Sequence, residues 1–303
     1  MRKPHKGIKR ILYLFQQTFA EVINDNVLKL SAALSYYTIF SLPALLIIIT
    51  SLCSIYFKAA AVQGEIYSQI KDLIGPSAAL QIQDIVKSVN LTGHTTLATV
   101  ISILVLVTGA SGIFTEIQDS INYIWGIKSK PRKGLIRFVM NRLISFSMIA
   151  SVGFLLLVGL IVSSMMELLN KKLLSFFPSE TIYVYYVLNI VSLFALTVLL
   201  FLIIFKILPD GKISFRDCFL GACFTAALFM IGKFAIGAYL GSTTLSTVYG
   251  SAGSIVLVLA WVYYSAIILY FGAEFTKVYS KNYGHKIIPN KYTILLDKSQ
   301  GNL

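Results

Sequence analysis

Long stretches without a charged residue are the feature that most constrains the fold of this chain. Leu30–Phe57 contains no Asp, Glu, Lys, Arg or His, and further charge-free stretches cover 95–115, 143–166, 181–205, 218–232 and 234–273. A helix needs about 20 apolar residues to cross a hydrocarbon core of about 30 Å. Helices satisfy their own backbone hydrogen bonds, which lipid cannot do for them. These stretches therefore predict helices embedded in a membrane.

The last charge-free stretch is too long for a single crossing, and Gly241-Ser242-Thr243-Thr244 marks a turn within it. Dividing it there gives six crossings. The fold class that we expect is all-α, a polytopic membrane protein with six transmembrane helices at about 30–57, 95–115, 143–166, 181–206, 218–240 and 252–276.

Lysine and arginine are distributed unevenly among the loops that these spans create. Of the 26 Lys and Arg residues, 20 fall in 1–29, 126–142, 206–217 and 275–303, whereas five fall in the alternate loops. Because basic loops are retained on the cytoplasmic side of a membrane, both termini are expected to be cytoplasmic. This arrangement accounts for the net charge of +13, so we expect no nucleic-acid partner.

The segments outside the spans carry amphipathic patterns. In 1–29 the apolar residues fall on one helical face: Ile8, Ile11, Leu12, Phe15, Phe19, Val22 and Ile23. This pattern predicts an interfacial helix that is attracted by anionic headgroups at the cytoplasmic face. Membrane lipids are therefore expected partners. Segment 58–94 carries two shorter patterns, which predict short outer helices. The chain is thereby divided into a basic tail with an interfacial helix (1–29), a six-helix domain (30–280) and a basic cytoplasmic tail (281–303).

Polar groups within predicted spans are candidate functional residues, because lipid makes them costly unless they are paired or hydrated. Lys233 either reaches the outer headgroups or faces a pore. Glu274 lies either at the inner interface or buried against a basic partner. Pro43 removes a helical donor, which either exposes a carbonyl to a cavity or forms a packed kink.

Asn122 shares a helix face with Glu116 and Asp119, and we expect this face to pair with arginines of the inner loops. Asp25 and Lys29 are spaced for an intrahelical ion pair. The full candidate set for a translocation path or polar cavity is Tyr36, Tyr37, Ser41, Pro43, Asn122, Lys233, Tyr249, Tyr264 and Glu274, with the inner-loop residues Pro209, Asp210 and Arg216.

Several sequence blocks resemble those of the YihY/virulence factor BrkB family, in order and over about residues 10–280. They are Leu30–Pro43, Asn122–Trp125, Leu208-Pro209-Asp210-Gly211-Lys212, Phe215-Arg216-Asp217, Tyr249–Ser254, Trp261–Ser265 and Gly272-Ala273-Glu274. The resemblance implies a bacterial inner-membrane protein with six spans. Family members carry a ribonuclease name and a serum-resistance or virulence name, and neither brings a catalytic motif to these residues.

Three functions remain open from the sequence. Transport or passage of an amphiphilic, lipid-like solute fits the polar groups within the spans, and no Walker A pattern supplies an ATPase. The alternative is a non-catalytic envelope scaffold. Whether the chain forms a homo-oligomer is left open by the sequence for either function. An enzyme is disfavoured because His5, His94 and His285 are scattered and the acids form no metal-binding pattern. We therefore expect no catalytic residue, metal or cofactor.

Overall fold

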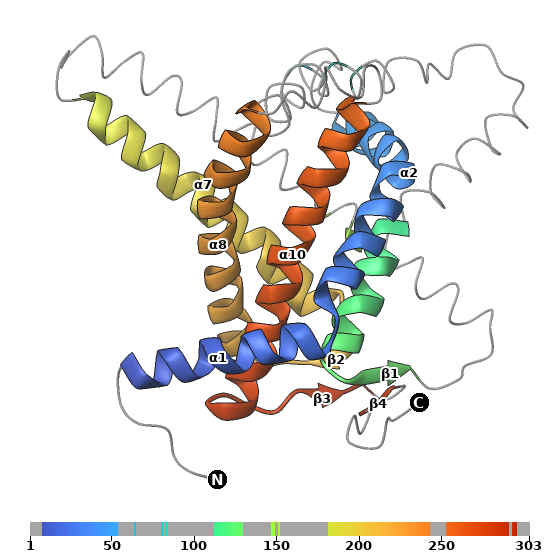
Figure 1. Cartoon of the computed structure of the whole chain (residues 1–303), viewed down its shortest axis with the longest axis vertical. Coiled ribbons are helices and arrows are strands. Elements are labelled where there is room, and N and C mark those ends of the chain that lie inside the picture. The colour runs from blue at the N-terminus through green and yellow to red at the C-terminus, as the bar shows by residue number, and fades with distance from the viewer. Residues whose placement is uncertain are drawn as a thin grey trace, which may run out of the picture.

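The computed structural model describes 8–53, 112–129, 181–242, 253–290 and 293–295, with isolated positions at 64, 80, 83, 147, 148 and 151. Within these ranges the backbone alone is described for 42–53, 181–186 and 234–242, and for the single positions 8, 129, 253, 254, 257 and 295. Most of the predicted spans at 95–115 and 143–166, most of the outer segment 58–94, and Tyr249 lie outside the described residues. The described chain is mostly helical, as the all-α prediction expects (Figure 1).

Helices α1 (Ile8–Asn24) and α2 (Val27–Cys53) are separated by a sharp turn. Asn26 adopts a left-handed backbone with φ of 51°, a conformation that asparagine tolerates better than most residues. The turn redirects the chain, so α1 lies across the lower end of the bundle while α2 runs upward (Figure 1). Because the break falls at Asn26, Asp25 and Lys29 do not share a helix, and the predicted intrahelical pair is wrong.

The centre of the bundle is α10 (Gly253–Asn282), which packs against α2 on one side and α8 (Phe215–Ser242) on the other. Helix α7 (Thr181–Ile207) packs on α8. Pro209 lies two residues after the last residue of α7, and its missing N–H and fixed φ prevent the helix from continuing. Asp217 lies in the first turn of α8, where a carboxylate complements the helix dipole.

Two glycine–threonine contacts bring α8 and α10 close together. A Cβ added to Gly221 would collide with the side chain of Thr276, and one added to Gly272 would collide with Thr225. Each threonine hydroxyl donates to its own helix, Thr225 to the Gly221 carbonyl and Thr276 to the Gly272 carbonyl, both at 2.7 Å. Small residues with internally satisfied hydroxyls are typical of helix packing in membranes.

A further helical segment, 112–124, completes the core beside α2. It buries Ile117, Ile121 and Ile124. The indole N–H of Trp125 donates to the Ala273 carbonyl of α10 at 3.1 Å. The segment ends at Gly126, whose φ of 67° is the left-handed conformation common after helices.

Four short strands lie at the same end of the bundle as α1 (Figure 1). Strand β1 (Ile127–Ser129) pairs with β4 (Thr293–Leu295), and β2 (Gly211–Lys212) pairs with β3 (Ile288–Pro289); both pairs are antiparallel. The sequence did not predict them, since two or three residues carry no readable periodicity. They place part of the segment 281–303 against the inner loops.

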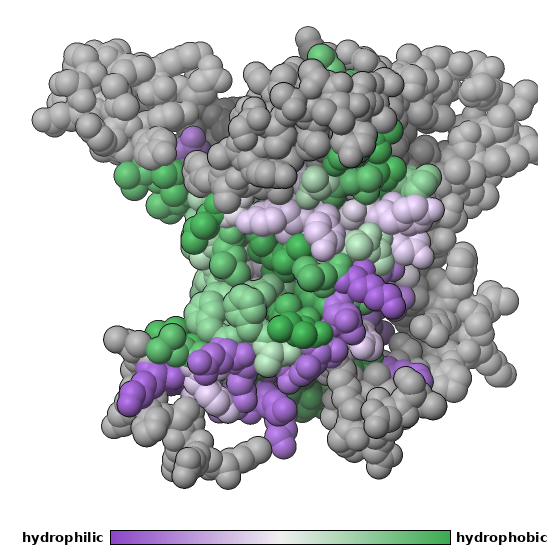
Figure 2. All heavy atoms as spheres, in the orientation of Figure 1, coloured by the Kyte–Doolittle hydropathy of each residue, from purple (hydrophilic) through white to green (hydrophobic). Residues whose placement is uncertain are grey.

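Three helices are long and apolar enough to cross a membrane, counted among the described residues only: Val187–Ile207, Phe215–Lys233 and Val258–Asn282. They coincide with the predicted spans 181–206, 218–240 and 252–276. Helix α2 covers most of the predicted first span. Figure 2 shows hydrophilic residues gathered at the lower end, near α1 and the strands, with a hydrophobic belt above them.

Candidate functional site

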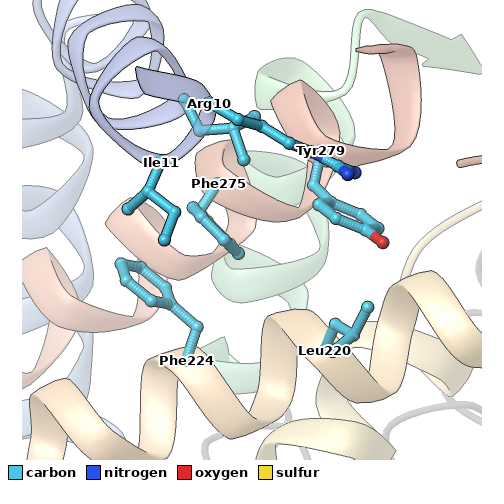
Figure 3. A pocket seen from close by; sticks show the side chains of 7 residues that line it. Arg10, Ile11, Leu220, Phe224, Phe275 and Tyr279 are labelled. Atoms are coloured by element: carbon cyan, nitrogen blue, oxygen red, sulfur yellow. The ribbon is translucent and has the colours of Figure 1, made fainter. Parts of the chain in front are cut away.

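An open apolar groove lies where α1 meets α8 and α10 (Figure 3). Its volume is about 660 Å³, within the range of small-molecule sites. We refer to it as the inner groove; its lining residues are Arg10, Ile11, Leu14, Leu220, Phe224, Phe275 and Tyr279.

The inner groove has an apolar side and a polar side. Phe224 and Phe275 stack with ring centroids 3.9 Å apart, and Figure 3 shows Ile11 beside them. The guanidinium of Arg10 reaches toward Tyr279 at the other side (Figure 3). Arg10 also lies over the ring of Tyr283, 3.6 Å from its centroid, so a cation–π contact holds the charge in place.

A largely buried ion cluster joins the end of α1 and the turn after it to α10. The ammonium of Lys277 contacts Glu21 at 2.8 Å, Asp25 at 3.0 Å and Glu274 at 3.0 Å. Glu274 is fully buried, which agrees with the predicted alternative of burial against a basic partner. The three carboxylates lie within 4.8 Å of one another and could ligate a metal ion, but the Lys277 ammonium already contacts all three.

Asp210 of the inner loop is held by the helical segment 112–124. Gln118 and Asn122 donate to its carboxylate at 3.3 and 3.2 Å, and the Asp210 N–H donates back to Asn122 at 2.8 Å. Thr293 donates to the Asp210 carbonyl. Asn122 thus binds an inner-loop aspartate, whereas the sequence predicted arginines. Burial and the Asp119 carboxylate raise the pKa of nearby Glu116, which a hydrogen bond with Ser120 partly offsets.

The polar residues predicted in the first span do not gather into one cavity among the described residues. Tyr36 and Tyr37 are 63% and 47% exposed and contact each other edge to face. Ser41 is buried, and its hydroxyl would lie 2.8 Å from a Cβ added to Gly112, so it packs against the segment 112–124. Pro43 lies within the continuous helix α2.

The remaining candidates are dispersed. Lys233 and Tyr264 are half-buried on α8 and α10, and a Cβ added to Gly232 would collide with the Tyr264 hydroxyl. Pro209 is buried beside Asp210, and Arg216 is exposed.

The sequence analysis missed Arg10 and Lys277, the cations of the inner groove and of the ion cluster. The position of Lys277, three residues after Glu274, was a readable signal for a pair on one helix face. The contact of Arg10 with Tyr283 had no local signal, because it depends on how α1 docks.

Comparison with known proteins decides the family. The family described as Virulence factor BrkB has a sequence model that matches residues 18–292. The chain belongs to this family. The predicted resemblance is thereby confirmed, and the matched range includes the end of α1 and the elements from α2 to β3.

Relatives of this BrkB family member are membrane proteins. A UPF0761 membrane protein of Pseudoalteromonas atlantica is 28% identical over 84% of this chain and 81% of its own length. Another, from Vibrio vulnificus, is 24% identical over 91% of this chain and 83% of its own. One from Pseudomonas aeruginosa is 26% identical over 83% of this chain but 59% of its own, so the chain spans about three fifths of that relative. No solved structure matches significantly.

Proposed function

We propose that this BrkB family protein passes an amphiphilic, lipid-like solute across the bacterial inner membrane without an ATPase of its own. The inner groove is the observation that supports this function best. It combines stacked aromatic rings with a held guanidinium, and an amphiphile presents the same combination of an apolar body and a polar head. Two of the helices that line the groove, α8 and α10, are apolar enough to cross a membrane.

The proposed topology has six spans with both termini in the cytoplasm, and α1 lying in the cytoplasmic interface. The exposed side of α1 supports this placement, because it is apolar: Ile11, Leu12 and Phe19 are 56%, 56% and 57% exposed. The opposite side carries Leu14 and Thr18, which are buried toward the bundle. A helix with an apolar outer side at one end of a bundle fits the headgroup region of a bilayer.

We propose no enzymatic activity. The acids that the described residues bring together are Glu21, Asp25 and Glu274, and the Lys277 ammonium contacts all of them. This ion pairing leaves the carboxylates poorly suited to activate water or to hold a catalytic metal.

Reconstitution into proteoliposomes tests the proposed function. Purified protein should move fluorescent phospholipid analogues between leaflets faster than protein-free vesicles do. Leu220→Trp fills the inner groove from α8 and should lower the rate at least roughly tenfold, because it removes space that the solute needs. Ile231→Trp adds the same bulk at a site on α8 that is 67% exposed and should keep the wild-type rate.

Wild-type rates equal to those of empty vesicles, across a panel of amphiphiles, would contradict passage. Crosslinking that recovers one partner in fixed stoichiometry, together with that result, would favour the envelope scaffold.

A further inference from the structure

The charge of Arg10 is available for a ligand. Among the described residues its guanidinium makes the cation–π contact with Tyr283 and no ion pair or hydrogen bond. Glu21 of α1 and Asp25 of the turn that follows it contact Lys277 instead. Arginine has five N–H donors in a planar fork that matches the oxygens of a phosphate. The groove therefore presents a held cation with unsatisfied donors.

The rest of the groove favours a ligand whose phosphate is attached to an apolar chain. Its aromatic side consists of the stacked rings of Phe224 and Phe275, and the edge of Phe15 contacts Phe224 with centroids 5.5 Å apart. Ile11 and Leu220 are exposed apolar residues at its margin. Burying these surfaces favours a ligand with a hydrocarbon chain, whereas a small hydrated anion would leave them exposed.

We infer that the inner groove binds an anionic glycerophospholipid of the cytoplasmic leaflet, with its phosphate at Arg10 and the start of its acyl chain against Phe224 and Phe275. This inference rests on the proposed function and names its substrate class. The Tyr279 hydroxyl lies on the same side as the guanidinium (Figure 3) and supplies a second donor. The location at the end of α1 places the phosphate where headgroups lie if α1 is interfacial.

Lipid retention measured by native mass spectrometry tests the site. The probe is dioleoyl phosphatidylglycerol, with dioleoylglycerol as the phosphate-free arm and inorganic phosphate as the competitor. Arg10→Gln should weaken phosphatidylglycerol retention about tenfold, the effect expected for losing a charged hydrogen bond. Retention by Arg10→Lys should lie between that of the wild type and that of Arg10→Gln, because an ammonium cannot bind two phosphate oxygens as the guanidinium fork does.

Lys9→Gln is the matched control, since it removes the same charge from the neighbouring, exposed position of α1. It should change retention less than about twofold if the effect belongs to the site rather than to general attraction. Circular dichroism of each variant should match that of the wild type.

Three outcomes would overturn the inference. They are equal losses in Arg10→Gln and Lys9→Gln, retention of dioleoylglycerol as strong as that of phosphatidylglycerol, and displacement of the lipid by millimolar inorganic phosphate.

The flux assay separates this inference from the proposed function. Loss of retention in Arg10→Gln with no wild-type flux would remove passage and leave the site. Flux that is unchanged in Arg10→Gln, with unchanged retention, would remove the site and leave passage.

Discussion

At the residue scale, Lys277 is the cation on which the docking of α1 depends. It lies among the carboxylates of Glu21 in α1, Asp25 in the following turn and Glu274 in α10. One oxygen of the fully buried Glu274 has no hydrogen-bond partner among the described atoms. Removing one member of a buried ion pair is costly, because the charges left behind lose their compensation. The cluster therefore makes the contact between α1 and α10 sensitive to a single side chain.

Lys277→Met should destabilise the fold by about 3–5 kcal/mol, because it leaves Glu21, Asp25 and Glu274 facing one another without a cation. Hydrogen exchange across 8–24 should accelerate as α1 loosens. Lys281→Met, at an exposed position one turn later, should change stability by less than about 0.5 kcal/mol. Unchanged exchange of α1 in Lys277→Met would show that other contacts hold this helix.

At the element scale, the interface between α8 and α10 depends on glycine. Gly221 and Gly272 leave room for Thr276 and Thr225 on the opposite helix. Neither glycine is at a turn, so each is retained against its low helix propensity by the close approach of the partner.

Gly221→Ala should destabilise the protein by about 1–3 kcal/mol, because the added methyl group collides with Thr276 and packed helices yield little. Thermal unfolding in detergent measures the loss. Adding Thr276→Ala should recover part of it, since the colliding hydroxyl and methyl group are removed. Gly64→Ala is the control, because a Cβ there meets nothing within 4 Å. Equal losses of stability in Gly221→Ala and Gly64→Ala would rule out the interface as the cause.

The helices were the predictable elements, and the contacts between them were not. Hydropathy placed the spans at 181–206, 218–240 and 252–276 because each depends on residues adjacent in the chain. The turn at Asn26 depends on a single backbone conformation. The bond between Asn122 and Asp210 joins residues 88 positions apart, and no local pattern records such a partner. The inner groove was missed for the same reason.

At the scale of the whole molecule, the two ends of the described chain lie at one end of the bundle. Helix α1, the four strands and the Asp210 network are all found there (Figure 1). An even number of crossings predicts this arrangement, and the distribution of basic residues predicts that this end is cytoplasmic.

Cysteine labelling tests that orientation. Lys128→Cys, Lys212→Cys and Lys281→Cys place thiols at exposed positions of this end, in a chain whose own cysteines are replaced by serine. A membrane-impermeant maleimide should leave them unlabelled in intact spheroplasts and label them after lysis. Labelling of Lys128→Cys before lysis would reverse the proposed topology and move the inner groove to the outer leaflet.

The interlocked glycines and threonines have a mechanical consequence. Helices in which threonine side chains fit over glycines of the partner cannot slide past each other without first separating, so α8 and α10 should move as a single rigid body. Any conformational change during the proposed passage would then occur at a different helix interface. The turn at Asn26, which joins α1 to α2, lies outside the contact between α8 and α10.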